Sequence, residues 1–118
     1  MGDFYDKYSE RTMDFAVAIV LFYARHCKQS DEIRIPGKQL LRAGSSVAAN
    51  FRAVTRGRSS AESYAKLCIV IEETDETLFW LELFKRTKLI DLVHIEPLIN
   101  EATELLKVFS TTRKNWKR

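Results

Sequence analysis

Residues 72–76, Glu-Glu-Thr-Asp-Glu, are the part of the chain with the clearest potential for metal chemistry. Clustered carboxylates bind metal ions, and di-iron helical bundles combine them with Glu-x-x-His pairs on facing helices. Neither His26 nor His94 stands in such a motif. We therefore interpret these acids as salt-bridging residues and expect no metal site.

Nucleophilic catalysis and nucleotide chemistry are also disfavoured. Cys27 follows His26, but consecutive residues on a helix point in different directions. The chain contains no Walker loop, no G-x-G-x-x-G and no G-x-S-x-G. It also lacks the spacing of helical nucleases, an Arg followed by four to six residues and a His. We expect no enzyme, no cofactor and no small-molecule substrate, and we expect Cys27 and Cys68 to be reduced, buried thiols of a cytoplasmic protein.

The charges are sorted along the sequence. Residues 34–60 contain six Arg and Lys and no acid, whereas residues 62–82 contain six acids and one Lys, although the net charge is only +3. Such sorting favours a polyanionic partner or a complementary protein surface. The six basic residues are Arg34, Lys38, Arg42, Arg52, Arg56 and Arg58.

Four helices are expected to position these charges. The 118 residues suffice for one domain, 1–118, with a basic tail at about 113–118. Four Gly and two Pro stand at the expected breaks. Short connections favour an all-α, antiparallel up-down-up-down four-helix bundle. The helices are predicted at about 6–26, 36–56, from a capping box at 59–62 to about 86, and 95–114.

Helix boundaries rest on a few local signals. Pro36 and Pro97 are expected in the first turns of their helices, and Gly57 is expected to end the second helix. The acidic N-terminus does not resemble a signal peptide. The apolar run 15–24 is shorter than the roughly 20 residues that a membrane span needs, so it is expected to be a buried helix segment.

The second helix presents three faces at about 100° per residue. An apolar stripe faces the core, and small residues let another helix approach closely. A basic ridge, Lys38, Arg42, Arg52 and Arg56, lies on roughly the opposite side. Between them runs a polar row, Gln39, Ser46 and Asn50, which we interpret as a hydrogen-bonded helix contact. The apolar stripe consists of Leu40, Gly44, Val47, Phe51 and Val54.

Three interpretations of the basic ridge remain open. It is a solvated face, a partner for acids of a neighbouring helix or subunit, or a surface for nucleic-acid phosphates. The tail around Trp116 is either a frayed, solubilising terminus or a segment that stacks on a base or an acyl interface while its cations meet phosphates. The candidate nucleic-acid-binding residues are Lys38, Arg42, Arg52, Arg56, Arg58, Arg113, Lys114, Lys117 and Arg118.

The third helix has two apolar faces, whereas a lone four-helix bundle needs one. The core stripe is expected to be Tyr64, Leu67, Ile71, Thr74, Leu78 and Leu81. The second face contains Ala65, Ile69, Phe79, Trp80 and Leu83 among Glu62, Glu72, Glu73 and Glu76. It predicts a homo-oligomer in which these acids meet basic residues of a neighbour.

Two segments resemble a known family. Residues 39–50, QLLRAGSSVAAN, and residues 64–67, YAKL, followed by 71–81, IEETDETLFWL, are similar to the 23S rRNA intervening-sequence protein family, also called four helix bundle protein. The resemblance covers roughly residues 14–109. It implies an antiparallel bundle that assembles into a ring, and a homopentamer is known for relatives.

The family is also similar to the accessory variability protein of diversity-generating retroelements, a basic pentamer that binds nucleic acid and a reverse transcriptase. Some members are encoded inside insertions in ribosomal RNA genes, which suggests RNA association. Ala53 departs from the usual Asn-x-x-Glu, which makes helix two more basic. Residues that match recurrent polar and aromatic positions are Gln39, Arg42, Ser46, Asn50, Glu73, Glu76 and Trp80.

Two functions therefore remain in view. The first is a non-enzymatic homo-oligomer that offers its basic helix-two and C-terminal surfaces to RNA. The alternative is a protein-interaction scaffold, in which helix-two cations pair with helix-three acids across a subunit interface. In either case the expected helix-contact or oligomer-interface residues are Gln39, Ser46, Asn50, Ile69, Glu73, Glu76 and Trp80.

Overall fold

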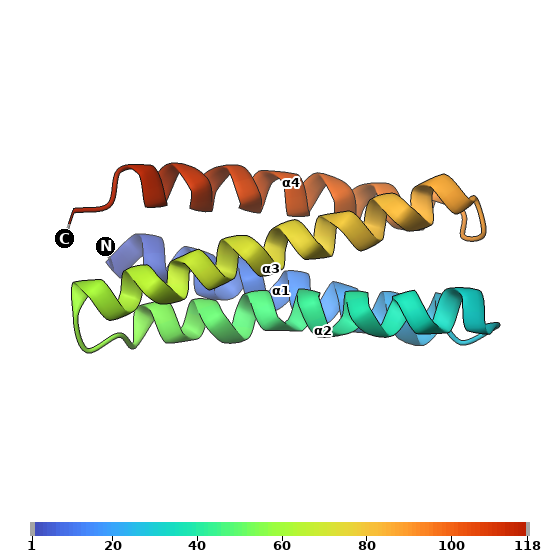
Figure 1. Ribbon diagram of the computed structural model, residues 1–118, viewed down its shortest axis with the longest axis horizontal. Helices are drawn as coiled ribbons and strands as arrows, with labels where there is room; N and C mark the ends of the chain where they lie inside the picture. The colour runs from blue at the N-terminus through green and yellow to red at the C-terminus, as the bar shows by residue number, and fades with distance from the viewer. Residues whose placement is uncertain (1, 118) are drawn as a thin grey trace.

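A computed structural model describes residues 2–117 and shows four long helices, with no strand within that range (Figure 1). The molecule measures 46 × 20 × 20 Å. Each helix packs against its sequence neighbours and α1 also contacts α4, so α1 and α3 lie on one diagonal of the bundle. The predicted all-α, four-helix fold is confirmed. The helices are α1 Gly2–His26, α2 Asp31–Thr55, α3 Ser60–Thr87 and α4 Leu92–Lys114.

The α2 apolar stripe predicted from periodicity is buried along its whole length. Within this stripe, position 44 has room only for glycine, because a Cβ on Gly44 would stand 2.8 Å from Cγ1 of Ile19 on α1. The missing side chain therefore allows the two helices to approach closely, as the small residues of this segment predict. Interiors are packed densely enough that even one added methyl group would force a shift.

The α2 and α4 starts differ from the predicted ones. α2 begins at Asp31, with Ser30 as its N-cap, so Pro36 is its sixth residue rather than part of its first turn. α4 begins at Leu92, where the Asp91 side chain accepts a hydrogen bond from the Val93 N–H at 3.0 Å. The Asp91 cap fixes the start of α4, whereas the Ser30 side chain makes no capping hydrogen bond at the start of α2. Each proline costs one internal hydrogen bond near the helix end, and the long helix tolerates that loss.

The turn between α2 and α3 is a modified capping box. Ser59 Oγ accepts from the Glu62 N–H at 3.1 Å, and Glu62 Oε1 accepts from the Arg58 N–H at 3.2 Å. α2 ends at Thr55, just before Gly57 as the sequence predicts, and Gly57 does not adopt a positive φ. A Cβ at Gly57 would lie 2.0 Å from Oγ of Ser63, whose hydroxyl donates to the Val54 carbonyl at 2.9 Å. Glycine is needed here for close packing of the turn on α3.

The buried face of α3 is wider than the predicted stripe. It faces both α2 and α4, so a second row is buried beside the predicted one, while Tyr64 and Leu78 lie half-buried at its margins. A helix with two packed neighbours must bury more than a single seam. The additional buried row consists of Ser63, Val70, Thr77 and Phe84.

The apolar run 15–24 on α1 is only partly buried, which corrects the expectation from the sequence. Phe15 and Ile19 are in the core. By contrast, Val17, Val20 and Leu21 are 50%, 44% and 41% exposed. The run is therefore a helix with one buried and one exposed apolar face. No helix within residues 2–117 is long and apolar enough to cross a membrane.

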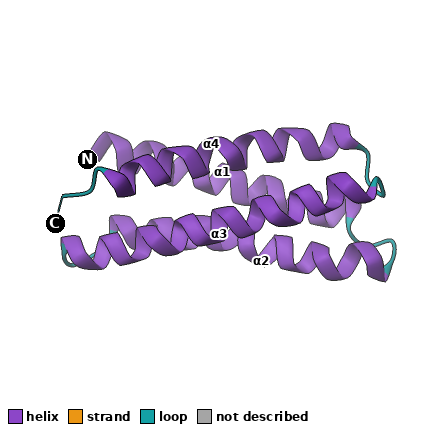
Figure 2. Ribbon diagram, turned by 45° about the horizontal axis from the view of Figure 1, so that its top comes forward, coloured by secondary structure: helices purple, strands orange, loops and turns teal. Residues whose placement is uncertain are grey.

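Aromatic rings join three helices at the end of the bundle where both chain termini lie (Figures 1 and 2). The rings of Phe51 on α2 and Phe109 on α4 stack with centroids 5.3 Å apart. Tyr8 on α1 meets Phe109 edge-on at 5.7 Å, and Phe4 lies 6.2 Å from Phe51. Such ring pairs add to the energy of burial. They hold the start of α1, the end of α2 and the end of α4 in fixed relative positions.

Candidate nucleic-acid interface

The fold brings together two basic segments that are more than fifty residues apart in the sequence. The end of α2, the turn after it and the end of α4 all lie at the end of the bundle that carries both termini (Figure 1). Their cations are all exposed. We call this group the basic end: Arg52, Arg56, Arg58, Arg113, Lys114 and Lys117.

Most cations of the basic end are available to a partner. Within residues 2–117, Arg58 alone among them forms an ion pair, with Glu62 at 3.6 Å, and its side chain is 90% exposed. Acids are also present at this end, since α1 contributes Asp3, Asp6 and Glu10. Glu10 shares a groove of about 260 Å³ between α1 and α2 with Arg52 and Arg56.

Arg42 belongs to a different environment, because it pairs with acids of its own chain. Its guanidinium contacts Glu73 on α3 at 3.3 Å and also Glu76. The hydrogen bond to Glu76 is the main cause that raises the pKa of Arg42. The Trp80 indole N–H donates to the same Glu76 carboxylate at 3.3 Å. The pairing of helix-two cations with helix-three acids is thus present within one chain at this position.

The basic ridge is therefore not one continuous free surface. Lys38 lies in the half of α2 far from the basic end, and Arg42 is engaged with α3. Arg52 and Arg56 are in the last part of the helix and join the basic end. The structure divides the candidate residues into these three groups, which the regular spacing along the helix does not reveal.

The polar row of α2 makes local contacts. Asn50 Nδ2 donates to the Ser46 carbonyl and to Ser46 Oγ, both at 2.9 Å. Both side chains are half-buried, as is Ile69 on α3, whereas Gln39 is exposed. The hydrogen bonds join residues of one helix, so they stabilise the α2 surface and do not link it to another helix as the sequence suggested.

The C-terminal tail is not frayed: it packs on the bundle as far as Lys117, the last described residue. The Trp116 indole N–H donates to Ser60 Oγ at 3.0 Å, and the Ser60 hydroxyl lies 3.2 Å from the Lys117 carbonyl, to which it donates. The Trp116 ring also meets Tyr64 edge-on at 6.1 Å. These contacts place Trp116 and Lys117 on the start of α3. Arg118, the remaining tail candidate, lies outside the described residues.

The groups considered for metal or nucleophilic chemistry do not form a reactive cluster among residues 2–117. His26 and His94 stack at 4.2 Å, and burial, His94 and Arg25 all lower the pKa of His26. Burial raises the pKa of the Cys27 thiol to about 11, so it stays protonated at neutral pH. In the part of the chain that the structure describes, no three His, Cys, Asp or Glu side chains are grouped so that they could hold a metal ion.

Comparison with known proteins places this geometry in context. Residues 7–111 match the family described as 23S rRNA-intervening sequence protein. A solved structure of a protein of unknown function from the S23 ribosomal protein family of Bacteroides thetaiotaomicron superposes with a TM-score of 0.85. It is 32% identical to this chain, and the match covers 94% of this chain and 98% of that one. No protein with a curated function matches.

Proposed function

Since this chain belongs to the 23S rRNA-intervening sequence protein family, we propose that it binds RNA through the basic end of its bundle. One observation carries the proposal. Exposed cations from the end of α2, from the turn after it and from the end of α4 gather at one end of the molecule. The names of the family and of the S23 ribosomal relative, both tied to ribosomal RNA or the ribosome, support RNA as the polyanion.

Phosphate binding suits this arrangement physically. Long Arg and Lys side chains that carry no ion pair can neutralise RNA phosphates without breaking a contact, and the counterions condensed on the RNA gain entropy when they are released. Within the basic end, the described residues that form no ion pair are Arg52, Arg56, Arg113, Lys114 and Lys117. A scaffold whose α2 cations meet a neighbour's acids would use Arg42, which its own α3 already engages.

A titration of fluorescently labelled single-stranded RNA with the protein, followed by anisotropy, tests this proposal. If three to five phosphates are contacted, log affinity should fall against log salt with a slope of about −2 to −3.5. RNA binding would be contradicted if the anisotropy of both a labelled single strand and a labelled duplex stayed unchanged at low salt and tens of micromolar protein. A slope near zero would contradict the phosphate contacts.

Assembly into a ring is a second proposal, and exposed apolar side chains support it. The outer face of α1 exposes Met13, Val17 and Val20 at spacings of 4 and 3, and the outer face of α3 exposes Phe79 and Leu83. Contiguous apolar surface of this kind commonly marks an interaction site. The α3 face is the one that the sequence singles out, and the α1 face was missed because the run 15–24 looks uniformly buried.

The placement of these two faces favours a ring over a two-fold dimer. Because α1 and α3 are diagonal, their outer faces lie on opposite sides of the bundle. Contact between the α1 face of one copy and the α3 face of the next repeats head to tail, and it forms a ring when the rotation from each copy to the next closes the series. Such side-to-side contacts leave the bundle ends open, so the basic ends of all copies would share one face of the ring. Several RNA contacts would then add through effective concentration.

A further inference from the structure

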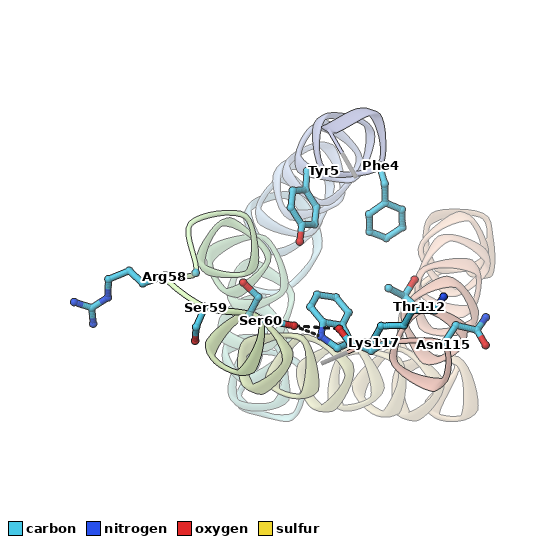
Figure 3. Close-up of a pocket in the computed structure, with 11 residues that line it drawn as sticks. Phe4, Tyr5, Arg58, Ser59, Ser60, Thr112, Asn115 and Lys117 are labelled. Carbon is cyan, nitrogen blue, oxygen red and sulfur yellow. Dashed lines mark hydrogen bonds between the residues drawn. The ribbon is translucent and has the colours of Figure 1, made fainter.

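A cavity of about 840 Å³ opens at the basic end, between the start of α1, the turn that leads into α3 and the docked tail (Figure 3). Its size is that of pockets that take small organic ligands. The contacts that close its floor include the hydrogen bonds from Trp116 to Ser60 and from Ser60 to Lys117. It is thus built by three segments that are distant in the sequence.

Aromatic rings and hydroxyl groups line this cavity. Phe4 and Tyr5 project into it from α1, as Figure 3 shows, and Trp116 lines it from the tail. The start of α3 and the end of α4 contribute polar groups to the lining, including the hydroxyls of Ser60 and Thr112. Flat aromatic surface with hydrogen-bonding groups at its edge is what a nucleobase needs, because every base stacks on rings and presents donors and acceptors at its rim.

The charge of the cavity lining is one-sided. Arg58 and Lys117 belong to it, and none of the eleven lining residues is Asp or Glu. The first turn of α3 also begins here, and its amide groups carry partial positive charge. Figure 3 shows the Arg58 side chain pointing away from the cavity, where it pairs with Glu62 at 3.6 Å, so it must leave this exposed ion pair to reach the rim. The ligand that fits this lining is both aromatic and anionic.

We propose that this cavity holds one unpaired nucleotide, with its base against Tyr5, Phe4 and Trp116 and its phosphate near Arg58 and Lys117. The inference rests on the proposed RNA-binding function and adds which part of the RNA is recognised. A base inside a duplex is stacked on both faces and paired at its Watson–Crick edge, so it cannot enter. The cavity therefore selects single-stranded segments, loops or ends, whereas the surrounding cations attract any RNA. A free mononucleotide offers the cavity the same base and phosphate, so the test must distinguish it from a nucleotide within an RNA strand.

Trp116 provides a direct readout of occupancy. The chain has two tryptophans, so Trp80→Phe leaves Trp116 as the sole indole fluorophore. This variant is titrated with a mononucleotide, with an eight-residue single-stranded RNA and with a blunt RNA duplex, and the anisotropy of labelled RNA is recorded in parallel. We expect saturable quenching of Trp116 by the single strand, together with duplex binding that leaves Trp116 emission nearly unchanged.

The outcomes separate this proposal from RNA binding itself. Single-stranded RNA that binds by anisotropy but does not change Trp116 emission overturns the cavity proposal and leaves RNA binding intact. Equal quenching by duplex and single strand also overturns it, since a paired base cannot enter. Saturable quenching by the mononucleotide, with no RNA bound, supports the cavity, assigns free nucleotide as its source and removes the proposed RNA function.

A pair of variants at one wall checks that stacking is responsible. Tyr5→Ala removes a ring and should weaken single-stranded RNA binding at least about five-fold, the lower end of what one base–aromatic stack contributes. Tyr5→Phe keeps the ring and should bind within about two-fold of the wild type. Circular dichroism verifies that both variants fold. Equal affinity of folded Tyr5→Ala and Tyr5→Phe would overturn the role of the ring.

Discussion

Reversing two charges at the basic end, with Arg56→Glu and Arg113→Glu, is expected to weaken single-stranded RNA binding at least about ten-fold at moderate salt. The two residues come from α2 and α4 and meet no acid in an ion pair within residues 2–117. Each lost phosphate contact should also reduce the salt slope by about 0.7. Anisotropy titrations of labelled RNA at several salt concentrations measure both effects.

The matched control carries the same charge change at the opposite end of the bundle. Lys38 lies early in α2 and Arg86 late in α3, and both are exposed. Lys38→Glu with Arg86→Glu should bind RNA within about three-fold of the wild type, because only long-range, salt-screened attraction is lost. Equal loss in the two double variants would mean that total charge attracts the RNA and that the basic end has no special role.

Placing a charge on either exposed apolar face is expected to abolish assembly. Val17→Glu on α1 or Phe79→Glu on α3 would bury an unpaired carboxylate in the contact, which costs far more than the lost apolar area. Light scattering at micromolar concentration should show an oligomer for the wild type. Each variant should give a mass near the 13.7 kDa of one chain. Lys107→Glu, on an exposed α4 position, serves as the control that stays oligomeric.

Mixing the two variants distinguishes a ring from a symmetric dimer. Each variant keeps one intact face, so a head-to-tail contact forms once between Val17→Glu and Phe79→Glu chains and yields a one-to-one dimer. If each face instead paired with itself, either variant alone would still dimerise. A wild-type protein that scatters as a monomer would contradict assembly altogether.

Much of the fold could be predicted from the sequence because its strongest pattern is periodic. The α2 stripe repeats at helical spacing over four turns, so all five of its predicted residues are buried, although Ile33, Gly37 and Ala43 are buried beside them. The starts of α2 and α4 were wrong because Pro36 and Pro97 were taken as first-turn signals. Both helices begin upstream of their proline, since a long helix can absorb one missing N–H near its end, and at α4 the Asp91 side chain caps the earlier start.

The site was less accessible from sequence because it depends on which segments meet. Periodicity places Arg42 and Arg56 on one face of α2, but the rotation of α3 decides that Arg42 meets Glu73 and Glu76. The hydrogen bond from Trp116 to Ser60 joins residues 56 positions apart, and no local sequence pattern predicts it. The candidate cations were identified by type, whereas their division into engaged and available groups required the packed bundle.

Photo-crosslinking of single-stranded RNA that carries 4-thiouridine, followed by peptide mapping, reports where the strand lies on the protein. The proposed mode of binding predicts crosslinks in residues 2–8, 52–62 and 113–117, with Tyr5 and Trp116 among the modified side chains. Crosslinks confined to the other end of the bundle, around residues 31–42 and 83–94, would contradict recognition at the basic end.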